Sequence, residues 1–295
     1  MKNTVFTGAG VALVTPMNDD LSINYTKLEE LIEMQIAGGT DAIITCGTTG
    51  ESATMSHAEH ADVIKFTVEC VKGRIPVVAG TGSNETAFAA DLSMEAERLG
   101  ADALLLVTPY YNKTSQRGLI AHYNYVADRV NIPMILYNVP SRTGCNIKPE
   151  TYLELSKHKN IVATKEANGD ISSVAKTMEL CGDNLQVYSG NDDQIVPIMS
   201  LGGKGVISVL SNVAPSAAHD IPTLCLAGDY ASASKLQLEY LQLINDLFID
   251  VNPIPVKEAL NIMGYKVGPC RMPLYEMDDA SKQKLTASLK KHGLC

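Results

Sequence analysis

The sequence lacks any concentration of positive charge. Its 295 residues include 24 Lys and Arg against 33 Asp and Glu, which gives a formal net charge of −9 at pH 7. Proteins that bind nucleic acids or anionic membranes usually present a basic patch or stripe, and no basic tract interrupts this acidic background. We therefore expect no nucleic-acid partner and no membrane partner.

Long apolar runs and ordered cysteine motifs are missing as well. No stretch approaches the roughly 18 apolar residues that indicate a membrane-spanning helix, and the N-terminal segment does not have the pattern of a secretory signal peptide. The seven cysteines are scattered and never spaced as CxxC, which argues against a disulfide framework and against a zinc site. We expect a cytoplasmic protein with reduced cysteines and no bound metal.

The sequence does contain a regular series of short apolar runs separated by helical patterns. The apolar residues of each run are continuous rather than alternating, as in strands that are covered on both faces. Between the runs, Ser56 and Glu59 have the spacing of a capping box, and Asn84 could cap the helix that follows it. The eight runs span residues 10–16, 41–47, 75–82, 102–111, 132–140, 161–166, 185–190 and 205–212.

Eight strands that alternate with helices predict a parallel sheet, and eight is the number that closes a (β/α)8 barrel. An open doubly wound sheet is the alternative, but the residues after the first run lack the glycine-rich turn typical of dinucleotide-binding sheets. Beyond residue 213 only helical patterns continue. We predict an α/β fold in which residues 1–213 form a catalytic TIM barrel and residues 214–295 form a C-terminal helical appendage.

Lys165 lies at the C-terminal end of the sixth apolar run, where (β/α)8 barrels place their active sites. A charged amine is costly to bury. Burial, however, also lowers the pKa of a lysine and frees its amine to attack a carbonyl group. Lys165 is therefore a candidate Schiff-base nucleophile, and the alternative is an ion pair with Glu166 or another carboxylate of the core.

Other polar residues at the strand ends admit two interpretations each. Tyr137 could exchange protons in imine chemistry, or it could be an ordinary core tyrosine. Thr48 and Thr49 could hold a small carboxylate, or they could only shape a glycine-flanked turn. Arg142 could bind a carboxylate, or it could be a solvated loop residue. No set of His, Asp and Glu with metal-ligand spacing stands at these ends, so neither a catalytic triad nor a metal hydrolase is indicated.

The motifs at the strand ends resemble those of a known family. The chain contains, in order, GTTGES (47–52), TPYYNK (108–113), YNVPSRTG (137–144), KEANGD (165–170), GGKGVISV (202–209) and NPIPVKEAL (252–260). Over essentially its whole length it resembles the dihydrodipicolinate synthases. They form a branch of the pyruvate-dependent class I aldolases and lyases, which also include N-acetylneuraminate lyase.

The resemblance implies a reaction and a set of site residues. A lysine of this family forms an imine with pyruvate, and the enamine attacks L-aspartate-4-semialdehyde to give 4-hydroxy-tetrahydrodipicolinate, in the first committed step of lysine and diaminopimelate biosynthesis. A tyrosine exchanges protons with the help of a threonine and of a second tyrosine, which reaches in from a neighbouring subunit. The matching catalytic residues are Lys165, Tyr137, Thr48 and Tyr111, and the matching substrate-binding residues are Thr49, Ile207, Arg142 and Gly190.

The resemblance also implies a lyase that needs no cofactor or metal and that assembles as a homotetramer of tight dimers. A sibling pyruvate-dependent aldolase acting on a keto sugar acid is the alternative function. Arg142 within SRTG favours the semialdehyde, because a sugar-acid pocket would need hydroxyl-binding groups at that place.

A possible allosteric cleft completes the resemblance. Many members of the family bind lysine at a dimer interface, and Phe88 stands where lysine-sensitive relatives have a glutamate that meets the amine of the effector. Losing a charged partner of a buried ammonium should weaken binding strongly, so we expect weak or absent inhibition by lysine. The residues that match this cleft are Ser52, Ala53, His57, His60, Asn84 and Tyr110.

Overall fold

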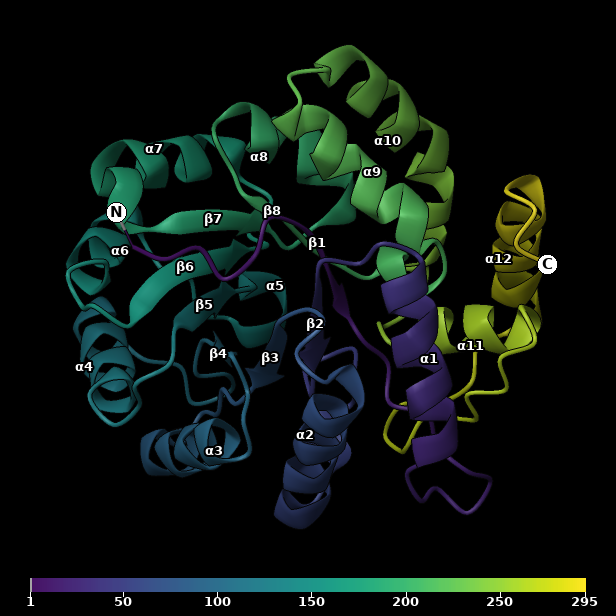
Figure 1. Ribbon diagram of the computed structural model, residues 1–295, viewed down its shortest axis with the longest axis horizontal. Helices are drawn as coiled ribbons and strands as arrows, with labels where there is room; N and C mark the ends of the chain where they lie inside the picture. Colours follow the sequence, from purple (N-terminus) through teal and green to yellow (C-terminus); the bar gives the residue numbers. More distant parts are fainter. Residues whose placement is uncertain (1) are drawn as a thin grey trace.

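The computed structural model describes residues 2–295, and its core is a closed barrel of eight parallel strands that follow one another in sequence order (Figure 1). Each strand pairs with the next, and β8 closes the barrel by pairing with β1. The predicted (β/α)8 fold is thereby confirmed. The strands are β1 Gly8–Ala12, β2 Ala42–Thr45, β3 Val77–Gly80, β4 Ala103–Val107, β5 Met134–Asn138, β6 Ile161–Glu166, β7 Gln186–Ser189 and β8 Gly205–Ser208.

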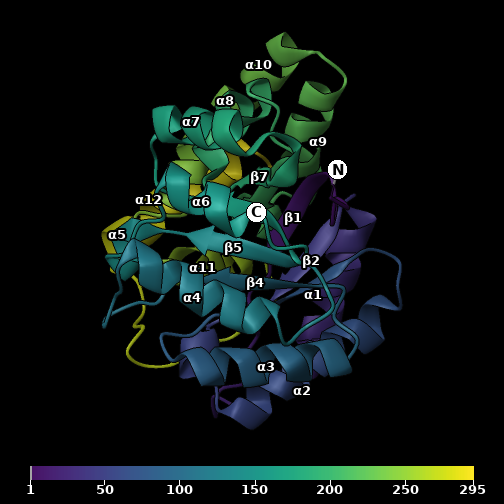
Figure 2. The same ribbon diagram turned by 90° about the vertical axis from the view of Figure 1, so that its left-hand side faces the viewer.

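Helices surround the strands, as Figures 1 and 2 show from two directions. The α-helices are α1 Tyr25–Ala37, α2 His57–Val71, α3 Thr86–Arg98, α4 Gln116–Ala127, α5 Pro140–Thr143, α6 Pro149–Leu155, α7 Ile171–Cys181, α8 Ile195–Ser200, α9 Pro215–Leu226, α10 Tyr230–Asp246, α11 Ile254–Ile262 and α12 Asp279–Lys291. Short 3-10 turns are η1 Ser52–Thr54, η2 Gly182–Asn184, η3 Asp192–Gln194 and η4 Leu210–Asn212.

Helix starts follow the local chemistry of their capping residues. The predicted capping box of Ser56 and Glu59 is confirmed, since each side chain accepts a hydrogen bond from the backbone N–H of the other. The predicted cap at Asn84 is wrong. The N-cap of α3 is Glu85, whose carboxylate accepts from the N–H groups of Ala87 and Phe88. A carboxylate satisfies two of the unpaired N–H groups at a helix start and favours the positive end of the helix dipole.

Alternation along the strands sorts side chains into two cores. In β5, Met134 and Leu136 pack in the layer between strands and helices, whereas Ile135 and Tyr137 pack inside the barrel. Successive side chains of a strand point to opposite faces, so the register of β5 fixes which residues reach the interior. Both faces are buried, which accounts for the continuous apolar runs in the sequence.

The four C-terminal helices lie together on one side of the barrel (Figure 1). The first of them, α9, packs against β1 and α10, while α12 packs against both α10 and α11. The division of the chain into residues 1–213 and 214–295 stays a prediction. None of the helices formed by residues 2–295 is both long enough and apolar enough to cross a membrane.

Barrel closure between β1 and β8 should tolerate no side chain at Gly205. This residue has φ +153°, and a Cβ atom added to it would lie 1.8 Å from the carbonyl oxygen of Gly8. We expect Gly205→Ala to lower the free energy of unfolding by about 3 to 5 kcal/mol, from overpacking and backbone strain together. Gly73→Ala is the matched control, because Gly73 has φ +68° but open space around it. It should lose only about 1 to 2 kcal/mol. Denaturant unfolding at one protein concentration measures both, and equal losses would contradict the steric argument.

Candidate active site

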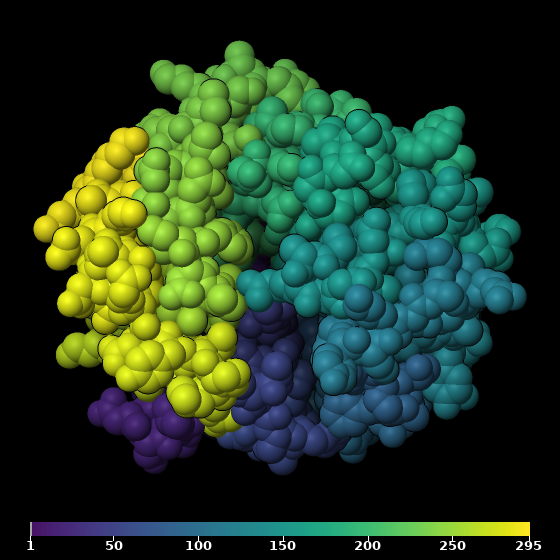
Figure 3. Space-filling view, turned by 180° about the vertical axis from the view of Figure 1, so that it is seen from behind, coloured from purple at the N-terminus to yellow at the C-terminus, as the bar shows by residue number. Residues whose placement is uncertain are grey.

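A cavity of about 740 Å³ lies at the carboxyl ends of the barrel strands. Figure 3 shows the surface hollowed near the middle of one face, where C-terminal segments meet segments of the barrel. The cavity is lined by residues in or just after seven of the strands, together with one stretch of the C-terminal region. The polar and charged residues among them are Thr48, Thr49, Tyr137, Ser141, Arg142, Lys165, Asn191, Asp250 and Asn252.

Lys165 is the most buried charged group of this cavity. It is 6% exposed and lies next to Tyr137 in the register of β5 and β6. Its Nζ is 4.3 Å from the centroid of the Tyr137 ring. Among residues 2–295 no ion pair includes Lys165, and Glu166 points to the opposite face of β6. The ion-pair interpretation of Lys165 is therefore not supported by the geometry.

Burial decides the protonation of this lysine. Desolvation lowers the pKa of Lys165 to about 8, opposed by the negative charge of Asp192 and aided by the positive charge of Arg142. One unit of pKa corresponds to about 1.4 kcal/mol of difference between the two protonation states. A much larger fraction of the amine is consequently neutral near pH 8 than for a solvated lysine, and a neutral amine can attack a carbonyl group.

Tyr137 and Arg142 face the same space. Burial raises the pKa of Tyr137 to about 12, with Arg142 acting in the opposite direction, so the phenol keeps its proton at neutral pH and can donate it. Arg142 belongs to the short helix α5, and its Nη2 donates to the backbone oxygen of Asn252 at 3.2 Å. The remaining guanidinium N–H groups could bind a carboxylate within the cavity.

Gly190 permits the close packing around Lys165. It directly follows β7, and a Cβ atom added to it would lie 2.7 Å from Cβ of Ala167 and 3.1 Å from Cγ of Lys165. Ile207 in β8 is fully buried and packs inside the barrel with Tyr137, although it does not line the cavity itself. Thr48 and Thr49 both line the cavity.

Tyr111 is the one predicted catalytic residue that the chain does not bring to its own cavity. Its side chain is 91% exposed and its φ is +68°. A bulky residue with positive φ is strained, and this one leaves a large aromatic side chain in solvent. The sequence resemblance assigned this residue to the site of a neighbouring subunit, and that assignment stays a prediction.

The predicted allosteric residues are only partly brought together. A second cavity of about 370 Å³ shares Thr48 and Arg142 with the first, and it is lined by Ser52, Ala53, His60, Tyr110 and also Phe88. His57 instead bonds to Glu95, with 2.7 Å between Nε2 and Oε2. Asn84 lines a separate surface pocket beside His122.

Several residues of the site are not among the predicted ones. Residues 248–252, between α10 and α11, line the cavity, and Nδ2 of Asn252 donates to Oγ1 of Thr49 at 3.0 Å. Asp192 is fully buried, and its Oδ2 accepts from the N–H groups of Val209 and Leu210, at 3.0 Å each. Asn252 is the first residue of the motif NPIPVKEAL, and Asp192 lies just beyond the seventh apolar run.

The opposite face of β6 holds a separate polar network. Glu166 accepts hydrogen bonds from the side chains of Tyr152 and Asn138 and from the N–H group of Asn168. Burial raises the pKa of Glu166 to about 7. Because this network faces α6 rather than the cavity, it supports the strand without touching the reacting groups.

Across residues 2–295 no group of three or more His, Cys, Asp and Glu side chains is placed to hold a metal ion. The site is that of a (β/α)8 enzyme built around a buried lysine and a neighbouring tyrosine. More specifically, the chain belongs to the dihydrodipicolinate synthetase family, whose sequence profile matches residues 5–292.

Three proteins illustrate the similarity. The 4-hydroxy-tetrahydrodipicolinate synthase of a Thermoanaerobacter species is 57% identical over 291 residues, which cover 98% of each chain. A chloride-inhibited dihydrodipicolinate synthase from Acinetobacter baumannii, solved in complex with pyruvate, is 42% identical with a TM-score of 0.97, over 99% of this chain and 100% of that one. The enzyme from Cyanidioschyzon merolae, solved with lysine bound, is 36% identical with a TM-score of 0.96, over 99% of this chain and 100% of that one.

Lys165 should react with amine-directed reagents at lower pH than a surface lysine. Its neutral fraction rises as the pH rises through about 8, so reductive methylation of Lys165 should reach half its maximal rate near that pH. Lys176 is the internal reference, because its hydrogen bond to Glu179 raises the pKa of this exposed amine. Peptide mass spectrometry at pH values from about 6 to about 11 measures the methylation rates of both lysines. Coinciding profiles would show that burial does not activate Lys165.

Proposed function

We propose that this protein is a lyase that condenses pyruvate with L-aspartate-4-semialdehyde, through a Schiff base on Lys165, to give 4-hydroxy-tetrahydrodipicolinate. In the cell this reaction opens lysine and diaminopimelate biosynthesis, and we place it in the cytoplasm. The observation that supports the proposal most strongly is the buried amine of Lys165 beside the Tyr137 ring, in a cavity that also contains Arg142. The family membership of the chain supports the choice of substrates.

The first half of the reaction forms an enamine. The neutral amine of Lys165 attacks the keto carbon of pyruvate, and loss of water leaves a protonated imine. Removal of a proton from the adjacent methyl group then gives the enamine. Tyr137 is the proton donor and acceptor of these steps, because its phenol keeps its proton at neutral pH and faces Lys165. Thr48, at the same cavity, would relay protons to and from the phenol.

The second half joins the two substrates. The enamine carbon attacks the aldehyde carbon of the semialdehyde, and the new oxygen takes a proton. The amino group of the bound intermediate then attacks the imine carbon, closes the ring and releases Lys165. The steps exchange protons and water but involve no net oxidation or reduction, so the proposal includes no cofactor.

Two carboxylates have to be held during these steps. Thr49 and the turn around it would hold the carboxylate of pyruvate, with Ile207 shaping the wall behind and Gly190 leaving room beside Lys165. Arg142 would receive the carboxylate of the semialdehyde, since its guanidinium lies at the cavity and has free donors. The net charge of the chain is negative, so local cations have to provide the attraction.

Assembly would complete the site. We propose a homotetramer of tight dimers in which Tyr111 of each chain enters the cavity of its neighbour as the second relay group. The 91% exposure of this side chain supports the proposal, because a large exposed aromatic residue is typical of an interface. The cleft lined by Ser52, Ala53, His60 and Tyr110, with His57 and Asn84 nearby, would then lie at the same dimer contact.

Borohydride reduction in the presence of pyruvate tests the proposed function. Reduction of the imine should fix the three-carbon unit on Lys165 irreversibly, and peptide mass spectrometry should find it there and on no other lysine. Lys165→Met, which removes the amine but keeps a similar length, should give no adduct and no turnover of the semialdehyde. An adduct on another lysine, or faster turnover of N-acetylneuraminate than of aspartate semialdehyde, would refute the proposal.

Lysine should inhibit this enzyme weakly or not at all. Phe88, which is 42% exposed, lines the second cavity and packs edge-on against the His57 ring, with 5.6 Å between the ring centroids. An apolar ring offers no charge to the amine of lysine. We expect Phe88→Glu to lower the lysine concentration for half-inhibition at least about tenfold, equivalent to about 1.4 kcal/mol. Phe88→Gln is the uncharged control. Half-inhibition of the wild-type enzyme at low-millimolar lysine or below would contradict the prediction.

A further inference from the structure

We propose that the buried ion pair between Glu51 and Lys257 positions the turn that receives the carboxylate of pyruvate, so that the C-terminal region controls pyruvate affinity. The inference rests on the proposed function. Glu51 belongs to the GTTGES turn, and Lys257 belongs to α11, 206 residues later in the chain. Their side chains are 0% and 2% exposed, and Nζ of Lys257 is 2.7 Å from Oε1 of Glu51.

Glu51 holds an unfavourable backbone conformation. Its φ is +57° and its ψ is +32°, in the left-handed region that residues with a Cβ atom seldom occupy. Such strain persists only where the surrounding structure fixes the residue. Here the side chain is fixed at both oxygens, since Oε1 accepts from Nζ of Lys257 and Oε2 accepts from the N–H group of Arg271 at 2.8 Å.

The backbone conformation of Glu51 directly shapes the GTTGES turn. Its own N–H donates to the carbonyl oxygen of Thr48 at 3.1 Å, and the N–H of Gly50 donates to the carbonyl oxygen of Gly47, also at 3.1 Å. The hydroxyl of Thr15 donates to the carbonyl oxygen of Gly50 at 2.7 Å. Any movement of Glu51 would therefore move the backbone and hydroxyl groups of residues 47–50, of which Gly47, Thr48 and Thr49 line the cavity.

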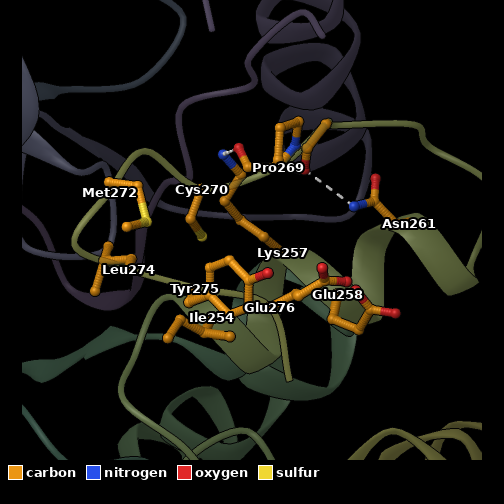
Figure 4. Close-up of a pocket in the computed structure, with 11 residues that line it drawn as sticks. Ile254, Lys257, Glu258, Asn261, Pro269, Cys270, Met272, Leu274, Tyr275 and Glu276 are labelled. Carbon is orange, nitrogen blue, oxygen red and sulfur yellow. Dashed lines mark hydrogen bonds between the residues drawn. The ribbon is translucent and has the colours of Figure 1, made fainter. Parts of the chain in front are cut away.

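Lys257 is anchored independently of the turn. Its Nζ also donates to the carbonyl oxygen of Pro269 at 2.6 Å, and Figure 4 shows this bond beside the neighbouring one from Asn261 to Gly268. These contacts join α11 to the loop that precedes Arg271. The amine thus links α11 and the loop after it to the strained residue of the turn, without lining the active-site cavity itself.

A purely stabilising role accounts poorly for this pair. Two apolar side chains of similar size often stabilise a core as well as a buried ion pair does, because desolvation of the charges offsets their attraction. The pair has a further electrostatic effect at this place. Without Lys257, the negative charge of Glu51 would stand behind a turn that has to accept a second carboxylate, that of pyruvate.

The test is steady-state kinetics of Lys257→Met and of the double variant Glu51→Gln/Lys257→Met, which leaves no unpaired buried charge. In both, we expect the KM for pyruvate to rise at least about tenfold, while kcat at saturating pyruvate and the KM for the semialdehyde change less than about threefold. Glu59→Gln is the matched control. It breaks the ion pair of Arg271 with α2 and leaves the bonds of Glu51 intact, so pyruvate KM should stay within about twofold of the wild type.

Two results would overturn the inference. One is a wild-type KM for pyruvate in the folded double variant, whatever its melting temperature, because the pair would then only stabilise the fold. The other is an equal rise of pyruvate KM in Glu59→Gln, because any loosening of the C-terminal segment would then suffice. If Lys257→Met does not fold, the double variant alone decides. Failure of the proposed function is distinct, because wild-type protein would then give no pyruvate adduct on Lys165.

Discussion

The site depends on keeping one amine out of water. Lys165 is placed inside the barrel by the alternation of β6, beside Tyr137 of β5. Desolvation then lowers its pKa to about 8. The cost of burying the amine and its activation are the same free energy, because the environment that penalises the ammonium favours the neutral nucleophile. Gly190 allows the chain to close over this lysine at a distance that no larger residue would permit.

Two nearby charges act on the pKa of Lys165 in addition to desolvation. Asp192 raises the pKa of Lys165, whereas Arg142 lowers it. The protonated imine of the proposed reaction is also a cation, so a nearby carboxylate would stabilise it as well as the ammonium. Glu166, the next residue along β6, is kept on the other face among neutral hydrogen-bond donors. Period-two alternation thus separates a carboxyl group whose pKa burial raises to about 7 from the amine that it would otherwise pair with.

The sequence predicted those features that depend on local pattern. Eight continuous apolar runs predicted the barrel. The position of Lys165 at the end of one run predicted that it lies at the active site. Contacts between distant segments could not be read in this way. The bond from Asn252 to Thr49 spans 203 residues and that from Lys257 to Glu51 spans 206. No local pattern specifies such a pair, because both partners read as ordinary polar residues until the fold brings them together. The cap at Glu85 was missed for a smaller reason, since Asn is among the preferred N-cap residues and Glu is not.

The C-terminal helices therefore do more than cover one side of the barrel. Residues 248–252 line the cavity, and Asn252 binds both Thr49, through its side chain, and Arg142, through its backbone oxygen. These two residues belong to the sites proposed for the two different carboxylates, so a single segment sets the distance between them. A barrel places catalytic groups at its strand ends but leaves the loops that hold them free to vary. The C-terminal region removes part of that freedom, and it does so at the residues proposed to bind the two carboxylates.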